Sequence, residues 1–353
     1  MPKTSQPNNE HKNDGGFKKG KAPVESPKFF VYNHGYINLA VVLVILTLFI
    51  IPPTRHFVHK LVIPQYRETI VFPGENHDHK LYRNGIDDLS TIFFYTLVWY
   101  VIHYTVQDKV VAPIQSRLKI SEERQAKFTE SFLLYLFGLY SIFHEIYIFC
   151  KIGVFDDLSL LYKGYPDTHR YLPLTVKMFF ILQIAYWLHK IPELVFQNLT
   201  KEERISRASY TFIFLWLTSF TYFTNFYRLG MALYFIELIS QLMFHKSRLM
   251  YYAGYKTFST FVYRFWIIFY VPIRFAKMAV AIYVLWYGLR RKEVHSIDWK
   301  DGNFNTPLIS FGTMFLVISI QCYMLYNLFK VISSRNTKNM RAFEGAGTAF
   351  RKA

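Results

Sequence analysis

The stretch Tyr36–Ile51 reads YINLAVVLVILTLFII and contains no charged residue. A polar tail, residues 1–28, precedes it. This tail has lysines, glycines and prolines but almost no apolar side chains, so we expect it to be disordered. It is also too long for the front of a cleavable signal peptide. The apolar stretch is therefore predicted to be a membrane anchor, which ends at Pro52-Pro53.

Seven further apolar blocks follow this anchor. Most are about 18 residues or longer, the length of helix that crosses a bilayer core of about 30 Å. They lie at about residues 88–106, 131–150, 172–191, 208–227, 229–245, 259–289 and 306–330. The sequence thus predicts an all-α, polytopic integral membrane protein with about eight transmembrane helices. This distribution excludes a soluble globular enzyme, and the hydrophobic share of 52% excludes a disordered protein.

The net charge of +17 reflects 41 Lys and Arg against 24 Asp and Glu. In a soluble protein this excess would suggest a nucleic-acid partner. In a membrane protein it usually orients the chain, because Lys and Arg accumulate on the cytosolic side. We therefore interpret the excess of Lys and Arg as a signal that orients the chain in the membrane, and we expect no nucleic-acid partner.

Eight spans would place both termini on one side of the membrane. The tails and loops of that side hold 24 Lys and Arg, against 13 on the other side. Both termini are therefore predicted to be cytosolic, although Arg290-Arg291-Lys292 is a basic run on the luminal side. The sequon Asn198-Leu199-Thr200 is predicted to be cytosolic as well, and so to carry no glycan.

Charged and polar residues recur inside the predicted spans, where a charge costs about 2.5–3.5 kcal/mol unless it faces a cavity or a partner. Depths estimated from the helical rise predict that Arg274 pairs with Glu237 near mid-depth, and allow a second pair between Glu145 and Lys177. Three spans thus present polar stripes to a shared interior. We predict a partly polar intramembrane cavity whose candidate cargo contacts are Glu145, Lys177, Gln183, His189, Glu237, Gln241, His245, Arg248, Arg274 and Lys277. The alternative is that these residues only form hydrogen bonds between helices.

Motifs for catalysis or for cofactor binding are missing from the sequence. It contains no G-x-S-x-G elbow, no complete G-x-x-x-x-G-K-[ST] phosphate loop and no H-E-x-x-H pair. Histidines of the first luminal loop, residues 52–87, could in principle bind a metal ion, but no cysteine accompanies them. We therefore predict no catalytic residues, no cofactor and no metal site.

Four segments, in order along the chain, resemble the family of translocating chain-associated membrane proteins (TRAM). They are YRNGIDDL at 82–89, QIAYWLH followed by IPEL and FQ at 183–197, HKSRL at 245–249, and GNFN at 302–305. The resemblance runs from about residue 80 to 330. One departure from the family is that residues 52–87 contain no glycosylation sequon.

The resemblance implies a TLC domain at 120–330 formed by the last six spans, preceded by two leading helices and a luminal loop at 29–119. Basic cytosolic tails at 1–28 and 331–353 would flank these parts. The resemblance further implies a multi-pass protein of the endoplasmic reticulum membrane beside the Sec translocon. As partners it implies signal sequences, nascent secretory and membrane polypeptides, and membrane lipids.

Ceramide synthases share the TLC domain, which leaves two alternatives open. Those enzymes use two adjacent histidines within a span, whereas this sequence has no His-His dipeptide and offers only the isolated His245 near a span end. A lone histidine is a poor base for acyl transfer. We therefore expect a non-enzymatic translocation and insertion factor, with a lipid-binding or lipid-transfer protein and a lipid acyltransferase as the alternatives.

Overall fold

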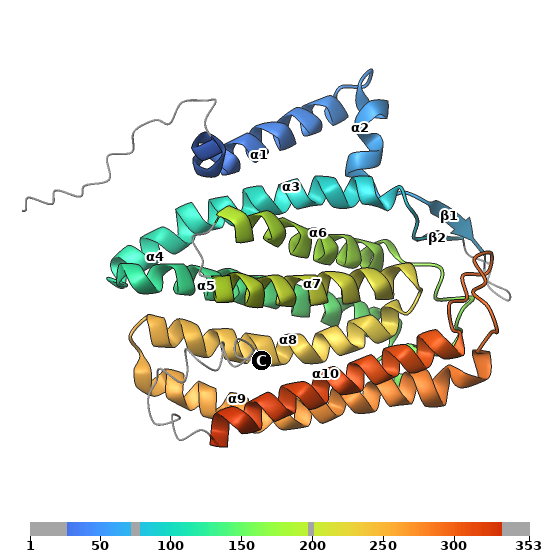
Figure 1. Ribbon diagram of the computed structural model, residues 1–353. Coiled ribbons are helices and arrows are strands. Elements are labelled where there is room, and N and C mark those ends of the chain that lie inside the picture. The colour runs from blue at the N-terminus through green and yellow to red at the C-terminus, as the bar shows by residue number, and fades with distance from the viewer. Residues whose placement is uncertain (1–26, 72–77, 197–200, 334–353) are drawn as a thin grey trace, which may run out of the picture.

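The computed structural model describes residues 27–71, 78–196 and 201–333, in which long helices form a bundle with a short β-hairpin at one end (Figure 1). The long helices are α1 (Pro27–Ile50), α3 (Asp88–Val106), α5 (Glu122–Ile152), α6 (Leu174–Phe196), α7 (Lys201–Phe223), α8 (Tyr227–Tyr252), α9 (Lys256–Ala281) and α10 (Pro307–Ser333). The shorter elements are α2 (Arg55–Val62), β1 (Arg67–Ile70), β2 (His79–Tyr82), η1 (Gln107–Val111), α4 (Ala112–Arg117), η2 (Leu158–Leu161), η3 (Ile282–Gly288) and η4 (Arg290–Lys292).

The two ends of the bundle differ. At the end we call the hairpin end, β1 pairs antiparallel with β2, and Tyr82 of β2 forms a further bridge to Leu172 just before α6. At the opposite end, α3 runs through η1 into α4, and α8 turns back into α9. Helix α1 packs against α3 at one edge, while α9 and α10 pack together at the other edge (Figure 1).

Membrane-crossing potential is clear for part of the bundle. Among the described residues, four helical segments are long and apolar enough to cross a membrane: Asp88–Arg117, Glu122–Ile152, Lys256–Gly288 and Pro307–Lys330. Gly35–Ile50 is a shorter apolar helix. The predicted blocks at 172–191, 208–227 and 229–245 do form the helices α6, α7 and α8, but these are not among the four segments. A mostly helical membrane protein is therefore confirmed, whereas the eight spans stay a prediction.

Element boundaries depart from the apolar blocks at several places. Helix α5 begins at Glu122, well before residue 131, because charged residues such as Glu and Arg sustain a helix beyond its apolar part. The tight turn expected around Tyr227-Arg228 lies just earlier, at Asn225 with a φ of 61°, and Tyr227 begins α8. Helices α1 and α10 extend slightly into the predicted tails. The remainder of both tails and the sequon at 198–200 lie outside the described residues.

The largest apolar core surrounds α6. Val176, Phe179, Ile181 and Ala185 of this helix are essentially inaccessible, and residues of α3, α5 and α8 pack against them. Helix α6 is thus an interior helix whose neighbours shield it on most sides. Polar side chains on α6 consequently face other protein groups, which is why its position matters for the site described next.

Candidate functional site

A cavity of about 660 Å³ lies among α5 to α10, and the end of α3 also contributes to its wall. Five of the ten sequence-predicted residues line it: Glu237, Gln241, His245, Arg248 and Lys277. The others, Glu145, Lys177, Gln183, His189 and Arg274, are fully buried and do not line it. Much of the remaining wall is aromatic or aliphatic.

The base of the cavity holds the predicted ion pair. Arg274 Nη1 lies 2.6 Å from Glu237 Oε2, so this pairing is confirmed. Lys277 Nζ lies 2.9 Å from the same oxygen, and Gln241 donates to Glu237 Oε1 at 2.9 Å. Arg274 also donates to Gln321 of α10 at 3.1 Å and stacks over the Tyr270 ring. One carboxylate therefore opposes two cations inside the bundle.

The second predicted pair, Glu145 with Lys177, does not form. Lys177 Nζ instead lies 2.7 Å from Asp88 Oδ1 at the start of α3, and both side chains are fully buried. Neither carboxylate oxygen of Glu145 has a hydrogen-bond partner among the described residues. Depth along the helices placed Glu145 and Lys177 at a similar level, but depth does not specify which neighbouring helix a side chain faces.

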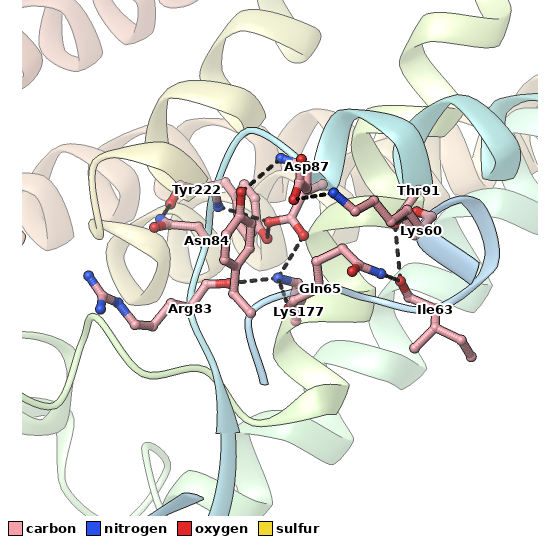
Figure 2. A network of polar contacts seen from close by, with 12 residues as sticks. Lys60, Ile63, Gln65, Arg83, Asn84, Asp87, Thr91, Lys177 and Tyr222 are labelled. Atoms are coloured by element: carbon pink, nitrogen blue, oxygen red, sulfur yellow. Dashed lines mark hydrogen bonds and ion pairs between the residues drawn. The ribbon is translucent and has the colours of Figure 1, made fainter. Parts of the chain in front are cut away.

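Figure 2 shows the network around Lys177 at the hairpin end. Lys177 Nζ donates to the carbonyl oxygens of Gln65 at 2.9 Å and Arg83 at 2.6 Å. Asp88 Oδ2 accepts from the Tyr222 hydroxyl at 2.8 Å and from the Gly85 amide at 3.0 Å. The buried charges are thus paired and hydrogen-bonded, which is the condition for burying them without a large loss of stability.

An asparagine chain continues this network across the hairpin end. Asn84 Nδ2 donates to the Tyr222 carbonyl at 2.6 Å and to Asn225 Oδ1 at 3.0 Å. Asn225 Nδ2 donates in turn to the Gly302 carbonyl at 2.8 Å. Three connections that are far apart in sequence are therefore joined here: the one before α3, the turn between α7 and α8, and the one before α10.

Gln183 and His189, both on α6, face other helices. Gln183 Nε2 donates to Ser141 Oγ of α5 at 2.6 Å, which matches the alternative in which such residues only join helices. His189 belongs to a cluster with His103 of α3 and Glu193 of α6. His103 and Glu193 are not among the ten predicted residues. The spacing of His189 and Glu193 at i and i+4 was an available signal, whereas His103 had none.

The end of the cavity that lies away from the hairpin end, which we call its mouth, is also charged. Arg207 Nη2 lies 3.0 Å from Glu130 Oε2, and Arg248 approaches the same oxygen at 3.9 Å. Lys190 Nζ lies 3.0 Å from Glu193 Oε2. These residues line the cavity, so its polar character extends from the Glu237 cluster to this end.

Several apolar helices of membrane-crossing length, packed around a partly polar cavity, are the architecture of an integral membrane protein. The family model of the TLC domain matches residues 122–330, from the start of α5 through most of α10. The chain belongs to the translocating chain-associated membrane protein family and carries a TLC domain, as its four segments predicted.

Named relatives fall into two groups. Translocating chain-associated membrane protein 2 of Homo sapiens is 31% identical over 307 residues, covering 86% of this chain and 80% of the relative. The Mus musculus protein of the same name is 30% identical over 304 residues, with the same coverage. Sphingosine N-acyltransferase LAG1 of Saccharomyces cerevisiae is 26% identical over 268 residues, covering 71% of this chain and 61% of the relative.

Proposed function

We propose that this protein is a translocon-associated factor of the endoplasmic reticulum membrane that assists cotranslational translocation of secretory proteins and insertion of membrane proteins. The observation that carries the proposal is the cavity, because a chain similar to translocating chain-associated membrane protein 2 here encloses a partly polar space inside an apolar bundle. The proposed partners are the Sec translocon, signal sequences, nascent transmembrane segments and membrane lipids.

The proposed topology has eight spans, formed by α1, α3 and α5 to α10, with both termini cytosolic. Residues 29–119 would supply the two leading helices and a luminal loop, and residues 120–330 a six-span TLC domain. The charge asymmetry of 24 against 13 Lys and Arg supports this orientation. The hairpin end would then be luminal, and the charged mouth of the cavity cytosolic.

The cavity would act by lowering the cost of bringing polar groups into the membrane. An entering segment that is weakly hydrophobic exposes backbone and side-chain polar groups to hydrocarbon, where each costs several kcal/mol when unpaired. The partly polar space and its charged groups at Glu237 and Lys277 would provide hydrogen-bond partners inside the bundle. Weakly hydrophobic signal sequences should therefore depend on the protein most.

Site-specific photocrosslinking to a stalled nascent chain tests this proposal. A crosslinker at Tyr210 of α7 or Ile320 of α10 faces the cavity, whereas one at Phe275 of α9 is 57% exposed and lies outside the lining. We expect adducts with the nascent chain from Tyr210 and Ile320 and few from Phe275. Equal yields from all three positions would argue against cargo entering the cavity.

A lipid ligand is the second candidate. A smaller hollow of about 270 Å³ is lined only by apolar residues of α7 and α10, and it shares Ile213, Leu217 and Ile320 with the main cavity. An acyl chain could enter along this seam. Lipid retained after purification and displaced by Leu217→Trp, with nascent-chain crosslinks unchanged, would favour lipid binding or transfer.

Acyl transfer is the remaining alternative, raised by the yeast acyltransferase relative. We propose a non-enzymatic role, since the chain has no His-His dipeptide. The purified protein should release no free coenzyme A from acyl-coenzyme A in the presence of a sphingoid base. Steady N-acylation in this assay would place it among the enzymes.

A further inference from the structure

Three side chains with metal-binding atoms converge where α3 meets α6: His103, His189 and Glu193. His103 Nδ1 lies 2.8 Å from Glu193 Oε1 and 3.2 Å from His189 Nε2. His189 Nε2 lies 3.8 Å from the same carboxylate oxygen. Two helices therefore bring two imidazole nitrogens and one carboxylate oxygen to a common point.

The spacing of these atoms fits a small divalent cation. In a tetrahedral zinc site with bonds of about 2.0–2.1 Å, the ligand atoms lie about 3.3–3.4 Å apart. The three observed separations, 2.8, 3.2 and 3.8 Å, bracket this value. Shifts of about half an ångström would bring all three ligands to bonding distance.

The orientation of His189 is fixed from outside the cluster. Its Nδ1 faces the carbonyl oxygen of Tyr186 one turn earlier on α6, with which it hydrogen-bonds. Because that nitrogen carries the proton, Nε2 directs its lone pair toward His103 and Glu193. A backbone carbonyl that holds the distal nitrogen of a histidine in this way is the usual second partner of a metal-binding imidazole.

The ammonium of Lys190 lies 3.4 Å from His103 Nδ1, so this lysine competes with an ion for that nitrogen. Its ammonium lies 3.0 Å from Oε2 of Glu193, so that Oε1 remains directed at the two histidines. His103, Lys190 and Glu193 all line the cavity, so an ion and its water can reach the cluster from that space. The protein thus supplies three ligands and leaves one position for water.

We propose that His103, His189 and Glu193 form a binding site for a divalent transition-metal ion, with zinc the best match to two imidazoles and one carboxylate. The bound ion links α3, a leading helix, to α6 of the TLC domain. It also adds positive charge at the mouth of the cavity. This inference is independent of the proposed function.

The test measures metal binding by the full-length protein purified in detergent and stripped with a chelator. Titration with Co²⁺ should give the visible absorption of a tetrahedral site and saturate at one ion per chain, and Zn²⁺ should displace it. His103→Gln and Glu193→Gln should each weaken binding by more than about tenfold. His245→Gln, which alters another buried cavity histidine, should bind like wild type.

Lys190→Met supplies a gain-of-binding test that misfolding cannot imitate. It removes the ammonium 3.0 Å from Glu193, so Co²⁺ should bind several-fold more tightly than to the wild type. Binding by wild type no stronger than by His103→Gln, or unchanged affinity in Lys190→Met, would overturn the proposal. The cluster would then be a hydrogen-bonded contact between α3 and α6.

Discussion

Glu237 lies between Arg274 and Lys277, so that a single carboxylate opposes two cations of α9. Glu237→Gln should lower the free energy of unfolding by about 3–5 kcal/mol, because it leaves buried cations without a counter-charge. Thermal unfolding in detergent measures the change. The matched control Gln241→Leu removes a hydrogen bond to the same carboxylate but no charge. An equal loss in both variants would contradict this account.

The Asp88–Lys177 pair can be examined by a double-mutant cycle. Asp88→Asn and Lys177→Met should each cost about 3–5 kcal/mol, since each leaves an uncompensated buried charge. The double variant should cost clearly less than the sum, because no charge remains buried alone. Additive losses would mean that the two side chains act separately, despite their 2.7 Å separation.

His169, in the connection between α5 and α6, should make the protein sensitive to acid. Burial, with a contribution from the charge of Arg228, lowers its pKa to about 3. The unfolded chain takes up this proton below about pH 6.5, so stability should fall as the pH drops from about 6.5 toward 3, by at most about 1.4 kcal/mol per unit. His169→Gln should flatten the melting-temperature profile over that range. A profile identical to wild type would exclude His169 as the cause.

Single side chains were predictable where depth alone decided the partner. Arg274 and Glu237 were the charged residues nearest mid-depth, and they pair. The partner predicted for Lys177 was wrong because the true partner, Asp88, is the first residue of an apolar block and so lies at the end of a predicted span. Identifying such a partner requires knowing which faces of two helices meet, and a single sequence does not contain that packing.

Between elements, a substitution can probe the close contact of α7 with α8. A Cβ at Gly230 would lie 2.5 Å from Thr221 Oγ1, so Gly230→Ala should force these helices apart and cost about 1–3 kcal/mol. At Gly312 of α10 a Cβ would meet no atom within 4 Å, so Gly312→Ala should be neutral or stabilise by up to about 1 kcal/mol. Thermal unfolding distinguishes the two, and equal effects would refute the close approach.

Helices were predictable as elements, but their ends were not. Apolar runs identify the part of a helix that avoids water, so α5 was found yet shortened by its charged first turns. The continuation of α3 through η1 into α4 was missed for the same reason. The hairpin of β1 and β2 has only four residues per strand, too few for the alternation of apolar and polar residues to stand out.

For the whole molecule, the proposed orientation predicts which loops receive a glycan. A sequon created in the exposed connection before α10, by His295→Asn with Ile297→Thr, should be glycosylated in microsomes because the proposed topology places the hairpin end in the lumen. The native sequon at Asn198 should stay unmodified. A glycan at Asn198 would contradict the proposed orientation. A folded variant without a glycan at residue 295 would contradict it as well.

The chain of Asn84, Asn225 and Gly302 acts on the bundle as a whole. It fastens three connections together at the hairpin end, whereas the cavity mouth at the opposite end is held by ion pairs such as Arg207–Glu130 that water can solvate. We expect the helices to tilt as rigid bodies about the hairpin end. A small tilt there would displace the far end of each helix most, so the mouth would widen for a guest while the hairpin end stays closed.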